Sequence, residues 1–435
     1  MSGVPAGKSG SSSPLYARAE PTIPRFQKKV PRTIIAEHDH PHTARLRRAA
    51  PRRPRRAAAG PARARREWMA HAWLGCDLFA WLRLLARNRF AVAPSCWYVA
   101  AIVTVVSMGH LLARWLQTAW FGSRIDRTPI PHAPLFIVGH WRTGTTLLHE
   151  LLVLDGRHTY PNNYQCLSPH DFLLTERLGK RWLWFLLPSH RPMDNMAFGW
   201  DRPQEDEFAL GLLGQPSPYL TLAFPNRPPQ DQAAFDVEGL PPRQRRAWKA
   251  AFLRFLRHLT FKNPRRLVLK SPTHSCRIPT LLELFPDARF VHIVRDPYVV
   301  FPSTVNLWKS LYESQGLQRP TFAGLEEHVF ATFNHLYARL EEGKKLVPPG
   351  HFHELRYEDL IADPVGQMRL LYERLGLGGF EEVRPRIERY LAERAGYQTN
   401  RYPSLSADLR AEITRRWGHV IRQYGYDGRN QSPTR

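Results

Sequence analysis

The sequence predicts an α/β fold in which a parallel β-sheet is flanked by helices. Short apolar runs, typical of buried parallel strands, alternate with longer segments that have helical spacing. A glycine-bounded turn joins the first run to a helix, and polar or charged side chains follow directly after each run. The expected strands are Leu135–Val138, Arg266–Lys270, Arg289–Val294 and His351–Arg356.

Before this sheet, residues 1–66 lack any hydrophobic period and predict a disordered Arg/Pro-rich tail. Ten arginines and no acid lie between Thr43 and Arg66, so much of the net charge of +24 is local. This tail could contact nucleic acid or an anionic membrane surface. A solvated tail, or a start codon assigned too early, explains it equally well.

Residues 67–127 predict a helical segment that is either membrane-associated or a lid. The stretch from Phe90 to Ala113 carries no formal charge and is long enough to span a bilayer. It also contains Pro94 and His110, and arginines flank both of its ends. Membrane contact and burial in the main domain both remain open for this segment.

The four cysteines are scattered and show no metal-ligand spacing, which favours a reduced, cytoplasmic setting and predicts no metal site. Residues 1–30 contain no apolar core of a secretory signal. Cytoplasmic location, with membrane association left open, is therefore the expectation.

The main domain is expected to span residues 128–435, and its first strand leads into a loop close in spacing to a P-loop. Gly139 and Gly144 match the motif glycines, and Thr146 matches its Ser/Thr position. Thr145 stands where the P-loop has lysine, and the loop cation is Arg142. This pattern predicts phosphate binding but argues against magnesium-dependent ATP hydrolysis.

Residues 155–230 predict loops and short helices over this loop, and they contain the acidic run that begins at Glu205. A basic helix is expected on the surface at residues 243–261, and further helices at 277–285, 298–312, 323–343, near 364–376 and 407–424. Functional groups should gather at the carboxyl ends of the strands.

Four strand ends carry candidate groups. The glycine loop ends the first strand, Lys270 and His274 follow the second, Arg295 follows the third, and Tyr357 follows the fourth. Ser303 lies eight residues after Arg295, about two turns along the next helix. These two residues could hold one phosphate as an ionic and a hydroxyl ligand.

With these motifs, residues 130–380 resemble the sulfotransferases that use 3′-phosphoadenosine-5′-phosphosulfate (PAPS). The sequence of the glycine loop is similar to that of their bacterial-type branch. The resemblance implies that a loop with Arg142 binds the 5′-phosphosulfate, that an arginine–serine pair binds the 3′-phosphate, and that a tyrosine contacts adenine. The positions that match are Arg142, Thr143, Gly144, Thr145, Thr146, Arg295, Ser303 and Tyr357. The Arg-Lys-Gly loop of the cytosolic branch is absent, and Asn400 and Arg401 are weak substitutes.

The resemblance implies in-line transfer of a sulfuryl group from PAPS, without a metal, to a hydroxyl or amine of an unidentified acceptor such as a carbohydrate or a lipid. Arg142 would be catalytic, and the general base is left open between His274 and Glu205. Two alternatives remain: a P-loop kinase or nucleotide hydrolase, and a polyanion- or membrane-binding protein acting through the basic tail.

Overall fold

The structure, a computed structural model, describes residues 71–182, 199–394 and 404–428. The predictions for the tail at 1–66, and for Asn400 and Arg401, lie outside these residues. The division of the chain into three parts stays a prediction.

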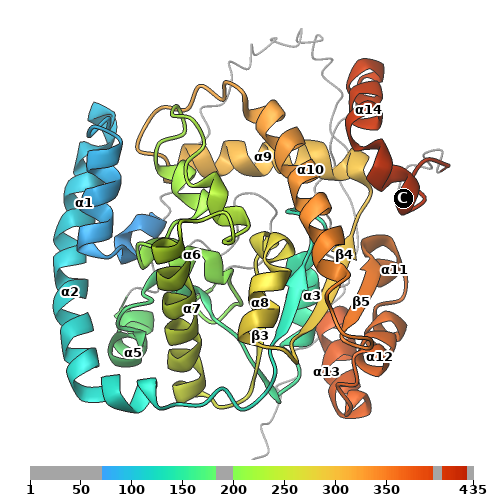
Figure 1. Cartoon of the computed structure of the whole chain (residues 1–435), viewed down its shortest axis with the longest axis horizontal. Helices are drawn as coiled ribbons and strands as arrows, with labels where there is room; N and C mark the ends of the chain where they lie inside the picture. Colours follow the sequence, from blue (N-terminus) through green and yellow to red (C-terminus); the bar gives the residue numbers. More distant parts are fainter. Residues whose placement is uncertain (1–70, 183–198, 395–403, 429–435) are drawn as a thin grey trace, which may run out of the picture. The chain divides into compact units, whose positions relative to one another are not determined.

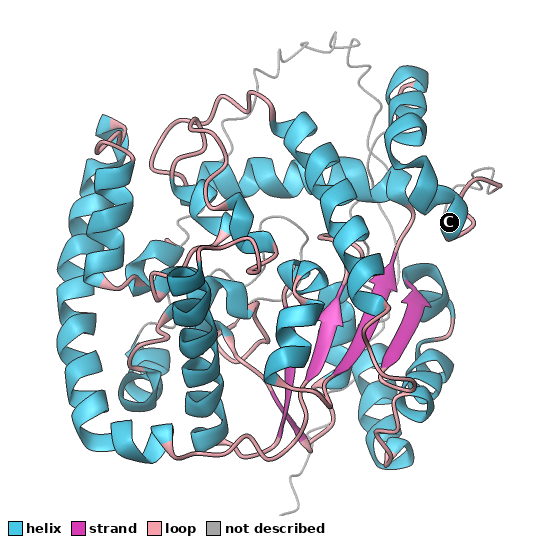
Figure 2. Ribbon diagram, in the orientation of Figure 1, coloured by secondary structure: helices cyan, strands magenta, loops and turns pink. Residues whose placement is uncertain are grey.

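A five-stranded parallel sheet lies at the centre of the main domain, and the fold-class prediction is confirmed (Figure 2). The strand order is β2-β3-β1-β4-β5, so β1, which leads into the glycine loop, is central. Leu135 of β1 aligns with Val268 of β3 on one side and Arg289 of β4 on the other. The strands are β1 (Leu135–Val138), β2 (His158–Thr159), β3 (Arg266–Lys270), β4 (Arg289–Val294) and β5 (Phe352–Arg356). The two-residue β2 has no apolar run and was not predicted.

Alternate strand residues face two separate cores, as the pleat of a sheet requires. Leu135 and Ile137 pack with four helices on one face: α3 (Thr145–Leu152), α11 (Tyr357–Ala362), α12 (Pro364–Arg374) and α13 (Phe380–Glu393). Phe136 and Val138 pack into the larger core on the other face, with α7 (Pro242–Lys262), α8 (Ile278–Leu284), α9 (Pro297–Gln315), α10 (Leu325–Lys344) and α14 (Ala407–Gln423). Figure 1 shows the helices on both faces of the sheet.

The predicted helices from α7 onward begin and end within about three residues of the observed ones, whereas α11 and α13 were not predicted. Helix α7, expected on the surface, in fact buries one face that includes Trp248 and Phe252. Short helices occupy the region after β2, as expected. They are α4 (Asn163–Leu167), α5 (Phe172–Trp182), α6 (Asp206–Leu212), η4 (Pro218–Ala223) and η5 (Gln232–Phe235), and η6 (Pro272–Cys276) follows β3.

The segment before the sheet is helical: η1 (Ala72–Gly75), α1 (Leu78–Arg87), η2 (Pro94–Cys96) and α2 (Trp97–Asp126). Two long-range hydrogen bonds fasten it to the end of α9 and the residues that follow. The Trp73 indole donates to the Gln315 carbonyl at 2.7 Å, and the Ala93 amide donates to the Leu317 carbonyl at 2.8 Å. The segment is therefore attached to the same helix that carries Ser303.

A buried carboxylate holds α5 against its neighbours. Glu176 accepts hydrogen bonds from Asn162, at 2.9 Å, and from Gln165, Lys180 and Lys262. Burial alone would raise the pKa of Glu176, but these donors outweigh it and lower the pKa to about 2.

We expect Glu176→Gln to destabilise the protein by about 3 kcal/mol at neutral pH, the free-energy equivalent of this pKa depression. Because the folded-state pKa is depressed, the stabilisation is present above the unfolded-state pKa of about 4.3 and is lost as the pH falls toward 2. Urea unfolding of both proteins between pH 7 and pH 2.5 checks this. A stability difference that stays constant over this range would contradict it.

Candidate active site

The glycine loop between β1 and α3 has a backbone that only glycine permits at two points. Gly139 has φ +144° and Gly144 has φ +100°. A Cβ atom on Gly144 would overlap the Tyr357 ring, and one on Gly139 would lie 2.7 Å from the Ile293 carbonyl oxygen. Helix α3 begins at Thr145, so its first amide groups, which lack acceptors within the helix, open toward the loop. This is the geometry of an anion site.

Two loop side chains anchor the loop in the core. Trp141 is buried among Tyr219, Phe235 and Trp308. His140 is fully buried, and burial lowers its pKa to about 4, so this ring is neutral at physiological pH. The Thr143 hydroxyl donates to the His140 carbonyl at 2.7 Å and also stabilises the turn.

Arg142 lies with the residues that the sequence predicts beside it. Its Nε donates to Ser303 Oγ at 2.8 Å, and its carbonyl accepts from Arg295 Nη1 at 3.2 Å. The Arg295 guanidinium stacks 4.2 Å above the Tyr357 ring. The structure brings these four residues together, and their individual roles stay predictions.

Glu205 is connected to the loop through Tyr219. The Trp141 indole donates to the Tyr219 hydroxyl at 2.9 Å, and that hydroxyl donates to Glu205. Burial and the neighbouring carboxylate raise the pKa of Tyr219 well above its usual value, so the phenol keeps its proton. Lys270, at the end of β3, donates to the other Glu205 oxygen at 2.6 Å. The network joins the glycine loop to the end of the neighbouring strand.

His274, the other candidate base, lies in a different environment. Its side chain is fully buried, contacts Asp206 at 2.9 Å, and packs against Phe136 and Phe252. The Glu205 side chain, by contrast, retains 13 % exposure. Glu205 is therefore the more accessible of the two side chains.

The three consecutive acids thus have three different partners. Glu205 pairs with Lys270 and Asp206 with His274, while Glu207 forms a fully buried ion pair with Arg277. Arg202, three residues before Glu205 in the sequence, lies 3.6 Å from Glu150.

The residues around the loop fit a doubly phosphorylated nucleotide better than a metal ion. Two guanidinium groups, a hydroxyl, a helix N-terminus and an aromatic ring converge there. Among the described residues, one group has metal-ligand proximity: Asp236, directly after η5, Cys276 of η6 and His335 of α10, all outside the loop. Arg339 contacts the same Asp236 carboxylate, which disfavours a cation there.

The loop, the strand-end cations and the parallel sheet together define a protein that binds a phosphorylated donor at the carboxyl edge of the sheet. A sequence model of the sulfotransferase family matches residues 134–382, and the chain belongs to this family. It is therefore an enzyme that transfers a sulfuryl group to an acceptor, and the family implies PAPS as the donor. The kinase and polyanion-binding alternatives are not favoured.

Relatives and solved structures agree with this assignment. The chain is 53 % identical over 370 residues to the omega-hydroxy-beta-dihydromenaquinone-9 sulfotransferase Stf3 of Mycobacterium bovis. The aligned residues make up 85 % of this chain and 95 % of that protein. A human carbohydrate sulfotransferase 6 is 25 % identical over 162 residues, or 33 % of this chain and 38 % of the human protein. The crystal structure of sulfotransferase STF9 from Mycobacterium avium shares the fold with TM-score 0.52 and 19 % identity, covering 80 % of this chain and 96 % of that one.

Proposed function

We propose that this enzyme transfers the sulfuryl group of PAPS, without a metal, to the hydroxyl group of a hydroxylated isoprenoid quinone. The observation that carries the donor part is the contact of Arg142 with Ser303 and Arg295 beside the glycine loop. The donor supplies the sulfuryl group and leaves as adenosine 3′,5′-bisphosphate.

Each donor-binding residue has a separate task in this proposal. The amides at the start of α3, with Thr145 and Thr146, hold the 5′-phosphate. Arg142 stabilises the negative charge that develops on the leaving phosphate. Arg295 and Ser303 hold the 3′-phosphate, and Tyr357, already stacked on Arg295, provides an apolar face for adenine.

We assign the general base to Glu205. Its carboxylate is held by Tyr219 and Lys270, and its side chain keeps some exposure, which a base that reaches a substrate requires. Lys270 also brings a positive charge to the same strand end. His274 remains the second candidate, but it would need to leave Asp206 and the surrounding aromatic rings before it could reach a substrate.

The acceptor assignment is supported by the relative that is 53 % identical, whose name specifies an omega-hydroxylated menaquinone. Apolar and aromatic side chains near Glu205 suit such a molecule, because Tyr219 packs against Phe208, Trp141 and Trp308. We place the enzyme in the cytoplasm in contact with a membrane surface, where an acceptor of this kind resides. The four cysteines are unpaired, which suits a reducing compartment.

Calorimetry with adenosine 3′,5′-bisphosphate, compared with ATP and magnesium, tests the donor assignment. We expect the bisphosphate to bind at least tenfold more tightly. Preference for ATP with magnesium would reject the assignment.

In the same assay we expect Arg295→Ala to weaken binding of the bisphosphate about 10- to 100-fold, because a charge-assisted hydrogen bond to phosphate contributes about 1.5–3 kcal/mol. Arg289→Ala is the matched control. Arg289 lies at the other end of β4 and donates to the Leu375 carbonyl. Equal losses in the two variants would show that Arg295 supports the fold rather than the ligand.

A further inference from the structure

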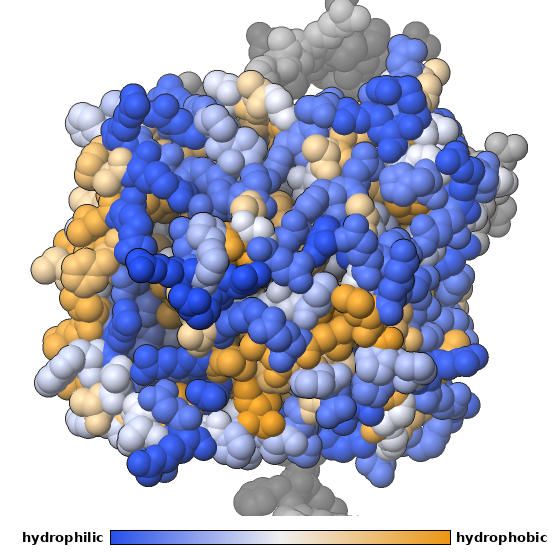
Figure 3. All heavy atoms as spheres, in the orientation of Figure 1, coloured by the Kyte–Doolittle hydropathy of each residue, from blue (hydrophilic) through white to orange (hydrophobic). Residues whose placement is uncertain are grey.

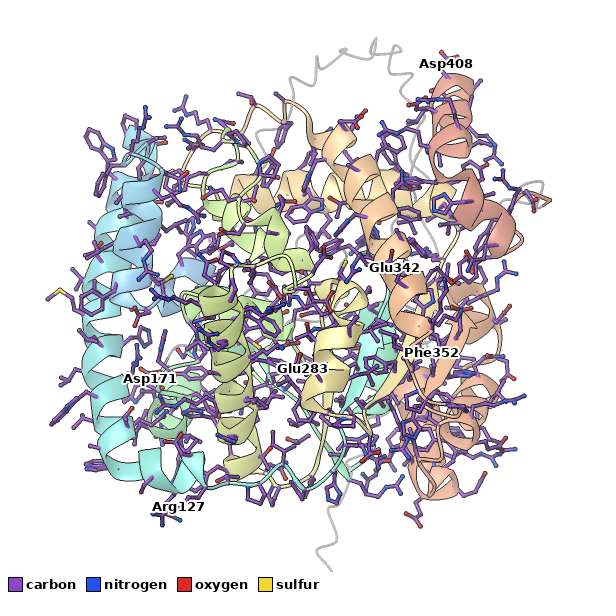
Figure 4. All side chains as sticks on the ribbon, viewed as in Figure 1. Arg127, Asp171, Glu283, Glu342, Phe352 and Asp408 are labelled. Atoms are coloured by element: carbon purple, nitrogen blue, oxygen red, sulfur yellow. The ribbon has the colours of Figure 1, made fainter. Side chains whose placement is uncertain are left out.

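Helix α2 differs from a helix of a water-exposed surface, because polar side chains lie among apolar ones on its buried side and large apolar side chains lie on its exposed side. Its side facing the domain carries the polar groups. The Thr104 hydroxyl accepts from the Trp81 indole at 3.0 Å, and Gln117 donates to the His170 carbonyl at 2.8 Å. His110 contacts Asp171, labelled in Figure 4, at 2.7 Å.

The opposite side of α2 is apolar and exposed. We call this the outer face, and its members recur every three or four residues with exposed fractions between 46 % and 68 %: Tyr98, Ile102, Val105, Met108, Leu112 and Trp115. Figure 3 shows apolar atoms along the edge where Figure 1 places α2. An apolar face of this length, about 26 Å from Tyr98 to Trp115, marks an interaction site rather than scattered exposure.

Neighbouring elements extend the outer face. Phe79 and Leu82 of α1 are exposed, and so are Leu178 and Trp182 of α5. Both helices contact α2. Large apolar side chains are therefore exposed on α2 and on two helices that pack against it.

The charges around the outer face are mainly basic. Within residues 97–123 the sole formal charge is Arg114, which pairs with Asp77 at 2.6 Å. Exposed arginines lie near both ends of the helix: Arg83 and Arg89 come before it, Arg124 lies in its last turn, and Arg127 follows it. Trp97 and Trp120 are also exposed near the two ends. Tryptophans and basic side chains around an apolar strip are typical of helices that lie in the interface of an anionic bilayer.

Helix α2 is long and apolar enough to cross a bilayer. Its packing against the rest of the domain argues against a membrane-spanning position. Its inner side contacts α1, α5 and α7, and buried residues recur along it from Val99 to Ile125. Because one side is covered by the protein, lipid can meet only the other side. The geometry fits a helix lying in the plane of the membrane surface.

We propose that the outer face docks the enzyme on an anionic lipid surface, so that the acceptor enters from the bilayer. The acceptor part rests on the proposed function, and the docking part rests on α2 itself. A second copy of the chain fits less well, because an antiparallel pairing of two α2 helices would bring Arg89 of one copy near Arg124 or Arg127 of the other.

Helix α9 connects the segment that contains α2 with the proposed catalytic centre. Helix α9 carries Ser303 in the donor site and, twelve residues later, Gln315, which accepts from Trp73 of the segment before α1. Twelve helical residues span about 18 Å. An extended isoprenoid chain can bridge such a distance.

Flotation of the full chain with vesicles of phosphatidylcholine, with and without phosphatidylglycerol, tests the docking. We expect binding to anionic vesicles, and at least a tenfold loss in the triple variant Val105→Gln, Met108→Gln, Leu112→Gln. Leu346→Gln with Ile361→Gln, two exposed apolar residues outside the outer face, is the matched control and should bind like the wild type.

Three outcomes would overturn docking through the outer face. One is equal flotation of the triple variant and the wild type. Another is vesicle binding that persists in the triple variant but disappears in high salt, which would assign the contact to the arginine-rich tail. The third is a wild-type dimer that ignores vesicles and becomes monomeric in the triple variant.

Activity separates this inference from the proposed function. The triple variant should sulfate a short, water-soluble alcohol at the wild-type rate and lose transfer to an acceptor embedded in vesicles. If the wild type binds vesicles but accepts no PAPS, the proposed function fails while the docking inference stands.

Discussion

Replacing Arg142 by alanine is expected to reduce turnover about 10³-fold while leaving the fold intact. The loss reflects removal of a guanidinium placed where charge develops on the leaving phosphate. The side chain contacts Ser303 Oγ, so weaker donor binding should accompany the loss of rate. Single-turnover measurements at saturating PAPS separate the two effects.

Arg142→Lys is the matched control. Arg142 has φ +68°, so alanine and lysine carry the same backbone strain, and only the charge distinguishes them. Arg142→Lys should retain most of the rate, because the glycine loop of the sulfotransferases that this sequence resembles has either lysine or arginine at this position. Near wild-type turnover in Arg142→Ala would show that the assigned role is wrong.

Glu205→Gln is expected to lower turnover by 10²- to 10⁴-fold, the usual contribution of a general base, with donor binding almost unchanged. Glutamine can still accept the hydrogen bond from Tyr219, and it removes the charge that Lys270 now faces. The measurements are the rate of transfer across a pH series and the affinity for adenosine 3′,5′-bisphosphate.

His274→Asn provides the comparison. Because it leaves Asp206 buried without its partner, it should mainly destabilise the fold, by about 3–5 kcal/mol. Any protein that remains folded should keep its turnover. A stable His274→Asn variant without activity, together with an active Glu205→Gln variant, would move the base to His274.

The sequence was most informative where chemistry depends on local spacing. Strands that are buried on both faces have apolar runs in their sequence, and the glycine turn follows directly after the central strand. Arg295 lies two residues before α9 begins, and Ser303 lies eight residues after Arg295, within the second turn of α9. These local rules predicted, without knowledge of the tertiary structure, that Arg295 and Ser303 lie at the same edge of the sheet as Arg142.

Contacts between distant segments could not be predicted in this way. The network at the site joins four separate segments, through Trp141, Tyr219, Glu205 and Lys270. Tyr219 belongs to no motif, and its place in an aromatic-rich stretch was the only sequence signal for it. The direction in which each acidic side chain of residues 205–207 points depends on the residue at which α6 begins. Likewise, the apolar content of Phe90–Ala113 predicts a helix but not which of its sides faces the domain.

The outward apolar side of α2 affects how the reaction rate would depend on substrate. An enzyme held at a bilayer meets its acceptor in two dimensions, so the rate would follow the number of acceptor molecules per unit area rather than per volume. Adding acceptor-free lipid to the bilayer would then slow the reaction even when the total amount of acceptor stays the same.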